Sequence, residues 1–245
     1  MIKKYKSIII ALSIIFLKTN TAYGGVINMD INGSAAETIE ILFFLTILTL
    51  LPSILIMMTS FTRIIIVLSF VKNALGLQQT PPNQVLVGIA IFLTLFTMSP
   101  VLNEIKTEAY EPYKNEEISQ EEFLDTASIP IKTWMLKQTG NNELQMFLDM
   151  SGDEAALNAE NLKDLPLTVV IPSFITSELK RAFIIGFLIF IPFLTIDMIV
   201  SSVLMSMGMM MLPPVMISMP FKILLFVVVD GWSLLFKTLI VSFNF

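Results

Sequence analysis

The sequence contains no cysteine and no histidine among its 245 residues. Without cysteine there is no disulfide framework, no thiolate metal ligand and no thiol redox chemistry. Without histidine there is no histidine-bound metal and no histidine general base. Charge is also scarce, because Asp, Glu, Lys and Arg make up 14% of the chain while 55% is hydrophobic. Soluble domains are usually about 25% charged, so the composition predicts an integral membrane protein.

Motifs that would carry catalysis are missing as well. The sequence has no GxSxG elbow, no HExxH pair and no Walker-type glycine loop. An intramembrane aspartyl protease would need two carboxylates sharing a proton, and the surroundings of Asp197 and Asp230 do not suggest such a pair. No basic patch interleaved with aromatic residues indicates nucleic-acid binding. We therefore predict a protein that is not an enzyme and that uses no metal or other cofactor.

The first 24 residues have the features of a signal peptide. Lys3, Lys4 and Lys6 form a positive start, and the apolar run Ser7–Leu17 is too short to span a bilayer comfortably. Small residues around Gly24 allow cleavage there, which would leave the new N-terminus outside the cytoplasm. An uncleaved membrane anchor is the alternative.

Residues 25–101 are predicted to form a first helical hairpin. Ile41–Thr62 carries no charge over 22 residues, enough for a membrane helix that Pro52 would kink. The apolar pattern then continues to Lys72, and a second membrane helix is expected from about Asn83 to Ser99, closed by Pro100. Bases without acids around the tip place that tip in the cytoplasm by the positive-inside rule.

Acidic residues are concentrated in the next part of the chain. The range 102–181 holds 15 of the 20 acids and 7 of the 15 bases. Apolar residues at three- and four-residue spacing predict short amphipathic helices here. The topology places residues 102–176 on the periplasmic side as a small helical insertion, whose acids are most simply a solvated face.

Residues 177–245 are predicted to form a second helical hairpin. Ser177 is the expected N-cap of its first helix, which would run over Glu178–Met207, and the second helix would run over Pro214–Phe236. The fold class is thus all-α, with two long hairpins and a helical insertion between them.

The tip of the second hairpin is unusually rich in methionine. Seven Met residues lie in 203–221, together with Gly208, Pro213 and Pro214, and with no charge. Met packs softly around changing shapes, and Gly and Pro break helices, so the stretch is predicted to be a deformable apolar turn. An ordinary apolar turn that happens to be rich in Met is the alternative.

Four charges lie in or beside apolar helices, where a lipid-facing charge would cost roughly 2.5–3.5 kcal/mol. They are Arg63, Asp197, Lys222 and Asp230. One interpretation is structural pairing between helices or between subunits. The other is an ion-coupled membrane transporter that relays ions through Asp197 and Asp230. Arg63 would be a cytoplasmic-side anchor or a partner of a neighbouring subunit.

Two long stretches resemble a known family. Met58–Pro100, which contains PPNQVL, and Pro172–Trp232, which contains MGMMMLPP, resemble the two signatures of the FliP family of flagellar biosynthetic proteins. The resemblance covers about 100 residues closely. The injectisome members of the same family are the nearest alternative, and the MGMMMLPP wording with the signal peptide favours the flagellar branch.

The resemblance implies a core subunit of the type III protein export gate in the bacterial inner membrane, at the flagellar basal body. Family members assemble as a ring or cone of several copies, a pentamer, with FliQ and FliR, and they pass unfolded flagellar subunits. Met209, Met210 and Met211 would form the gasket that seals the closed pore. Gly208, Pro213 and Pro214 would be the hinge of that loop.

Overall fold

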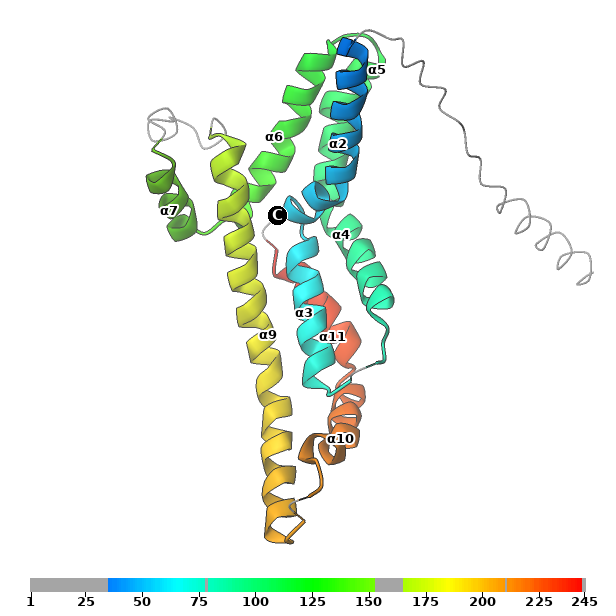
Figure 1. Cartoon of the computed structure of the whole chain (residues 1–245), viewed down its shortest axis with the longest axis vertical. Coiled ribbons are helices and arrows are strands. Elements are labelled where there is room, and N and C mark those ends of the chain that lie inside the picture. Colours follow the sequence, from blue (N-terminus) through cyan, green and yellow to red (C-terminus); the bar gives the residue numbers. More distant parts are fainter. Residues whose placement is uncertain (1–34, 78, 153–164, 210, 244–245) are drawn as a thin grey trace, which may run out of the picture. The chain divides into compact units, whose positions relative to one another are not determined.

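The structure is a computed structural model that describes residues 35–77, 79–152, 165–209 and 211–243. Every regular element in these ranges is helical, which confirms the all-α prediction (Figure 1). In chain order the elements are α2 (Ala35–Met57), α3 (Phe61–Ala74), α4 (Asn83–Ile105), the π-helix η1 (Lys106–Tyr110), α5 (Glu111–Lys114), α6 (Gln120–Gln138), α7 (Asn141–Ser151), α9 (Leu167–Ser206), α10 (Pro214–Val228) and α11 (Gly231–Val241). The predicted signal peptide, residues 1–24, lies outside the described residues.

The chain divides into two compact units, Met1–Thr49 and Leu50–Phe245. In the first unit, the described part of α2 carries exposed apolar side chains such as Phe43 and Phe44. The second unit holds all four predicted charges and the Met-rich turn.

The predicted first membrane helix is interrupted. Ile41–Thr62 and the apolar run after it were expected to form one long helix, but α2 ends at Met57 and α3 begins at Phe61. The break places Arg63 in the first turn of α3, where it is fully buried. Hydrophobicity alone does not reveal the break, because the apolar pattern continues across it.

The second predicted membrane helix is longer than expected. Pro100 was predicted to close it, but Pro100 lies inside α4. Helical structure then continues through η1 and α5 to Lys114, over 32 residues in all. The residues beyond Pro100 pack against α6, and this packing compensates for the backbone hydrogen bond that a proline removes.

The acidic region forms helices α6 and α7, at positions where short amphipathic helices were predicted. Ser119 caps α6 by accepting a hydrogen bond from the backbone N–H of Glu122 at 3.2 Å. On the inner face of α6, Trp134 is 4% exposed and lies edge-on to Phe174 of α9. Residues 153–164 lie outside the described residues.

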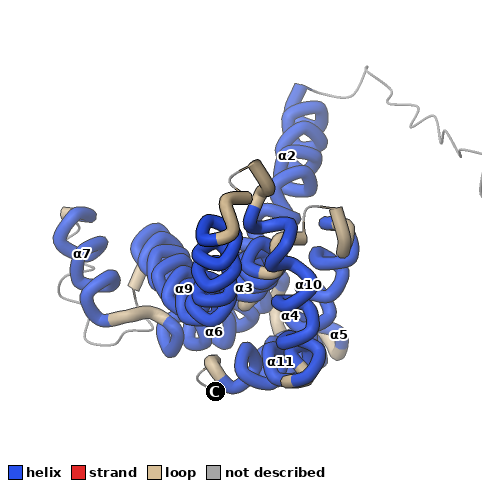
Figure 2. The backbone as a smooth tube through the Cα atoms, turned by 90° about the horizontal axis from the view of Figure 1, so that it is seen from below, coloured by secondary structure: helices blue, strands red, loops and turns tan. Residues whose placement is uncertain are grey.

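The 40-residue helix α9 is the central element of this unit. It contacts α3, α6, α7 and α10, and Figure 2 shows it between α7 and α3. Its interface with α3 includes the edge-on rings of Phe70 and Phe183, whose centres are 5.3 Å apart, and Gly186, where a Cβ would come within 2.5 Å of the Phe70 ring. At 1.5 Å per residue α9 is about 60 Å long, twice the roughly 30 Å hydrocarbon core of a bilayer.

Ser177 is not a helix N-cap, so that prediction was wrong. It lies inside α9, which begins ten residues earlier, at Leu167. Its buried hydroxyl donates to the carbonyl of Ser173 at 2.9 Å and accepts from the backbone N–H of Gly140 at 2.9 Å. A serine in a helix interior that bonds back to the preceding turn looks, in sequence, like a capping serine.

The predicted helix Pro214–Phe236 is also two helices. It breaks after Val228, and α10 and α11 meet at an angle of 65°. Asp230 adopts the left-handed conformation with φ of +50°, which Asp tolerates better than most residues. Gly231 then packs closely under the ring of Phe226, where a Cβ would come within 2.4 Å of a ring carbon.

Among the described residues, two helices are long and apolar enough to cross a membrane. They are Asn83–Lys114 and Leu167–Ser206, and the bent pair α10 and α11 would make a third if it forms one broken span. The apolar helix Ile41–Ile54 is too short to be counted with them. These helices fit the predicted membrane protein.

Candidate functional site

The Met-rich turn lies between two firmly defined helix ends. At the end of α9, Gly208 adopts φ of +76°. Its N–H bonds the carbonyl of Met205 at 3.0 Å, and the N–H of Met209 bonds that of Leu204 at 3.0 Å, which is a Schellman cap. Pro213 and Pro214 then start α10, where the missing proline N–H costs no hydrogen bond. The predicted hinge residues therefore lie at both ends of the turn.

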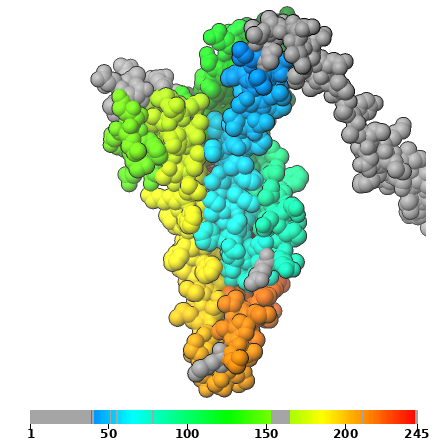
Figure 3. All heavy atoms as spheres, viewed as in Figure 1, coloured from blue at the N-terminus to red at the C-terminus, as the bar shows by residue number. Residues whose placement is uncertain are grey.

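The side chains of the turn have few neighbours in the single chain. Met211 is 99% exposed and Met209 is 43% exposed, and a Cβ at Gly208 would meet no atom within 4 Å. Met210 lies outside the described residues. Figure 3 shows the turn at the end of the paired segments α9 and α10, coloured yellow to orange. Exposed apolar side chains of this kind call for a covering partner.

Further along the two helices from the turn, α9 and α10 are joined by a charged cluster. The ammonium of Lys222 donates to Oδ2 of Asp197 at 2.5 Å, and Lys222 is only 2% exposed. The hydroxyl of Ser218, fully buried, donates to the other carboxylate oxygen of Asp197. Ser218 and Lys222 lie four residues apart, so one face of α10 presents both donors to one carboxylate. The sequence analysis did not identify Ser218 as a partner of Asp197. Its position four residues before Lys222 is the only feature of the sequence that indicates this role.

Asp230 does not join this cluster. It lies exposed at the break between α10 and α11, and within the described parts of the chain its carboxylate makes no hydrogen bond or ion pair. The sequence suggested a charge inside a helix because Lys222 to Phe236 contains no proline to mark the break. The structure therefore brings two of the four predicted charges together and leaves Asp230 apart.

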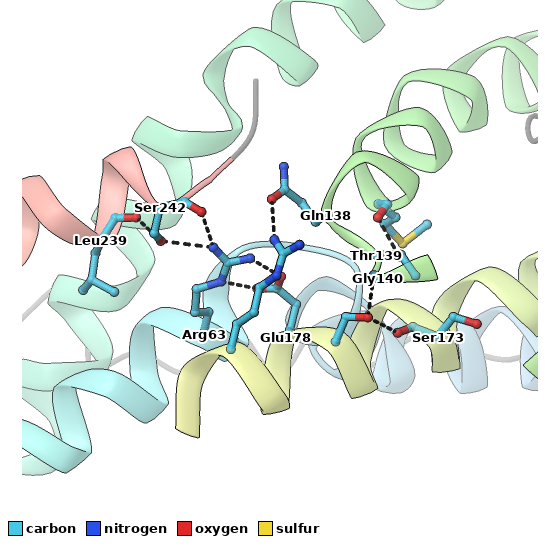
Figure 4. Close-up of polar contacts among 11 residues, drawn as sticks. Arg63, Gln138, Thr139, Gly140, Ser173, Glu178, Leu239 and Ser242 are labelled. Carbon is cyan, nitrogen blue, oxygen red and sulfur yellow. Dashed lines mark hydrogen bonds and ion pairs between the residues drawn. The ribbon is translucent and has the colours of Figure 1, made fainter. Parts of the chain in front are cut away.

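Arg63 is bound inside the same chain, by residues that the sequence analysis did not assign to it. Figure 4 shows its guanidinium facing Glu178 of α9 and the end of α11. Nε donates to one carboxylate oxygen of Glu178 at 2.9 Å and Nη2 donates to the other, a bidentate pair with both side chains fully buried. Nη1 donates to the carbonyl of Ser242 at 2.7 Å, and the guanidinium lies 3.9 Å from the ring centre of Phe243.

Glu178 could have been recognised from its spacing. It follows Phe174 by four residues and precedes Ala182 by four, and both of these are buried. A carboxylate on the apolar face of a helix needs a buried cation. The expectation that Ser177 began the helix hid this pattern, because it placed Glu178 in an exposed first turn.

A second set of contacts beside this pair attaches α7 to α9 (Figure 4). Besides the bond between Gly140 and Ser177, the ammonium of Lys180 donates to Glu143 at 2.7 Å. This hydrogen bond, together with a backbone one, lowers the pKa of the Glu143 carboxyl below its usual value. Arg181 points toward the amide oxygen of Gln138, at 3.5 Å.

The described residues hold no group of three or more potential metal ligands. A cavity of about 460 Å³ lies in the second unit, lined by residues of α4 such as Ile91, Leu95 and Met98 together with the end of α2 and Ile131. No titratable side chain lines it, so it offers no acid or base for chemistry.

Comparisons with known proteins agree with the resemblance of the two signatures. The sequence model of the FliP family matches residues 44–239, which include both charged pairs and the Met-rich turn. The chain belongs to the FliP family. Relatives named flagellar biosynthetic protein FliP include those of Bacillus subtilis (55% identical over 210 residues, 86% of this chain and 94% of the relative), Pectobacterium carotovorum (50% over 220 residues, 86% and 82%) and Aquifex aeolicus (45% over 240 residues, 96% and 99%).

Removing one member of the buried pair should destabilise this FliP-family chain strongly. Arg63→Met leaves Glu178 as an unpaired buried carboxylate, and we expect a loss of about 3–5 kcal/mol in the free energy of unfolding. The double variant Arg63→Met, Glu178→Met leaves no buried charge and should be more stable than the single variant. Denaturant unfolding in detergent measures both.

The exposed pair of Lys106 and Glu111, 3.9 Å apart, provides the matched control. Lys106→Ala should change the free energy of unfolding by less than about 1 kcal/mol. Equal losses for Arg63→Met and Lys106→Ala would contradict the role given to burial.

The contact between α7 and α9 should weaken in acid. Because the folded-state pKa of Glu143 is lowered, its contribution is complete above the ordinary pKa of about 4.3 and is lost as the pH falls through the folded value. Lys180 is 58% exposed, so the effect should stay below about 1 kcal/mol. Unfolding temperatures of wild type and Glu143→Gln should therefore converge in acid and separate at neutral pH, and a constant difference would refute the assignment.

Proposed function

We propose that this chain is a core subunit of the flagellar type III protein export gate in the bacterial inner membrane. The observation that carries the proposal is the Met-rich turn, which offers exposed thioether side chains at the joined ends of two apolar helices. Membership of the FliP family and the name of its relatives, flagellar biosynthetic protein, support the same conclusion.

In the proposed mechanism, Met209, Met210 and Met211 from several copies meet around a central path and form a gasket. Thioether side chains are apolar enough to exclude water and ions, as hydrophobic constrictions do in channels. They are also unbranched and re-pack easily, so the ring can part around an unfolded chain of any sequence and close behind it. Gly208, Pro213 and Pro214 allow the turn to change shape without unwinding α9 or α10.

The proposed assembly contains several copies of this chain, a pentamer, with FliQ and FliR, and with unfolded flagellar subunits as substrates. Residues 25–101 and residues 177–245 would each form a helical hairpin with its tip toward the cytoplasm. Residues 102–176 would lie on the periplasmic side. The length of α9 supports an assembly that extends beyond the bilayer, because about half of a 60 Å helix fills the hydrocarbon core. The injectisome branch of the same family is the alternative to a flagellar role.

The buried charges are proposed to act in structural pairing between helices. What supports pairing over a transporter relay is that Lys222 neutralises Asp197 at 2.5 Å, while Asp230 stands alone at a helix break. A relay needs carboxylates on a common water path, and a carboxylate held by Lys222 and Ser218 is poorly placed to exchange a proton.

Substituting the gasket should open a leak. Replacing Met209, Met210 and Met211 together by Ala removes most of the apolar volume of the constriction, so ion conductance of membranes that contain the complex should rise severalfold while secretion persists. The matched control replaces Met205 and Met216, which are exposed on the flanking helices, and should conduct like the wild type. Unchanged conductance of the triple variant, at normal complex level, would refute the gasket.

The pairing proposal is tested by Asp197→Asn, which leaves the Lys222 ammonium buried without a counter-charge. We expect the level of assembled complex to fall, because an unpaired buried charge is costly. Asp230→Asn should assemble normally, since Asp230 is exposed. Complex assembly and proton-dependent flux are measured separately, and loss of flux in a fully assembled Asp197→Asn complex would instead support the relay.

A further inference from the structure

The turn that follows α3 touches α10 just beyond the Met-rich turn. Gly76, two residues after the end of α3, adopts φ of +77°. A Cβ at Gly76 would lie 3.7 Å from Cγ1 of Val215 and 3.9 Å from Cγ of Met219. Val215 is the second residue of α10 and Met219 lies one turn further on, so Gly76 faces the first two turns of this helix across a space that a single Cβ would fill.

The end of α3 is well fixed. The N–H of Gly76 bonds the carbonyl of Asn73 at 3.0 Å, and the N–H of Leu77 bonds that of Lys72 at 3.2 Å, the same Schellman cap that ends α9. Leu75, just before the glycine, is 2% exposed. The ammonium of Lys72 also donates to the side-chain oxygen of Asn83 at 2.9 Å, which ties the end of α3 to the start of α4. The surface presented to α10 is therefore rigid.

The first two turns of α10 are also bonded to α9. Ser218 and Lys222 bond Asp197, whereas Val215 and Met219 meet Gly76. All four residues lie on one face of α10, because positions three and four apart in a helix are neighbours on its surface. With this one face the start of α10 bonds to α9 and lies beside the end of α3.

The Met-rich turn itself has no such support. A Cβ at Gly208 would meet open space, and Met211 is almost completely exposed. Support from neighbouring helices therefore ends near Pro213–Pro214, although backbone hydrogen bonds still cap α9 at Gly208.

We propose that the Gly76 turn is a brace that positions the start of α10, and with it the C-terminal end of the Met-rich turn. Gly76 and Ser218 are positioning residues of the Met-rich turn, Gly76 through Val215 and Met219, and Ser218 through Asp197. This inference rests on the proposed gasket function, and it adds a contact that holds one end of the gasket in place.

A cysteine cross-link tests the brace cleanly, because the chain contains no cysteine. In the assembled complex, Gly76→Cys with Met219→Cys is joined by oxidation or by a short bis-methanethiosulfonate linker. We expect efficient cross-linking, export within twofold of the reduced complex, and no added ion leak. Absence of the cross-link would overturn the contact, and an export arrest reversed by reductant would overturn the claim that α10 stays fixed.

Gly152 supplies the matched control, since it also has a positive φ, +60°, but open space around it. Gly152→Cys with Met219→Cys should not cross-link. If the Gly76→Cys complex fails to accumulate, a photo-reactive amino acid at Met219 alone replaces it. Its adducts should map to the end of α3 in an exporting complex, and adducts elsewhere would overturn the brace.

The two proposals fail separately. Gly76→Val places a β-branched side chain at positive φ against α10 and should raise ion leak severalfold, whereas Gly152→Val should not. If the Met209–Met211 variant leaks and Gly76→Val does not, the brace is wrong and the gasket stands. If the Met209–Met211 variant does not leak, the gasket itself is wrong.

Discussion

A charge inside an apolar helix bundle is tolerated only when a partner of opposite charge is buried with it, and this constraint organises the chain. Arg63 with Glu178 joins α3 to α9, and Lys222 with Asp197 joins α10 to α9. Both pairs also hold neutral groups, the end of α11 in the first and Ser218 in the second. Apolar packing permits many small shifts of one helix along another, whereas a bidentate ion pair permits one register.

Because both pairs include α9, this helix fixes the positions of α3 and α10 relative to each other. The Arg63 pair lies where α3, α9 and the end of α11 meet, and the Asp197 pair lies eleven residues before Gly208. Between the pairs, apolar side chains fill the interfaces. The Met-rich turn therefore joins two helices, α9 and α10, whose register relative to each other is set by a buried ion pair.

Properties that depend on local sequence could be predicted. Helical structure followed from the apolar pattern, and the helix ends at Gly208 and Pro213 followed from their backbone preferences. The contact of Asp197 with Lys222 was among the pairings considered, because both charges interrupt apolar segments. The roles of the gasket residues, the hairpins and the partners stay predictions.

Properties that depend on packing could not be predicted. The partner of Arg63 lies 115 residues away, at Glu178, and no local pattern joins them. Pro100 and Ser177 resemble helix ends in sequence, yet each lies within a helix that is stabilised by its neighbours. Conversely, the break at Asp230 carries no proline, and it is visible only in the left-handed backbone and in the close packing of Gly231 on Phe226.

The central claim is that the Met-rich turn lines the path of the exported chain. The most direct measurement places a photo-reactive amino acid at Met211 and illuminates complexes that hold a stalled export substrate, with Phe92 on α4, which is 75% exposed, as the comparison. The account predicts adducts with the substrate from position 211 and none from position 92. Substrate adducts from position 92 alone, or from neither position in a substrate-loaded complex, would contradict it.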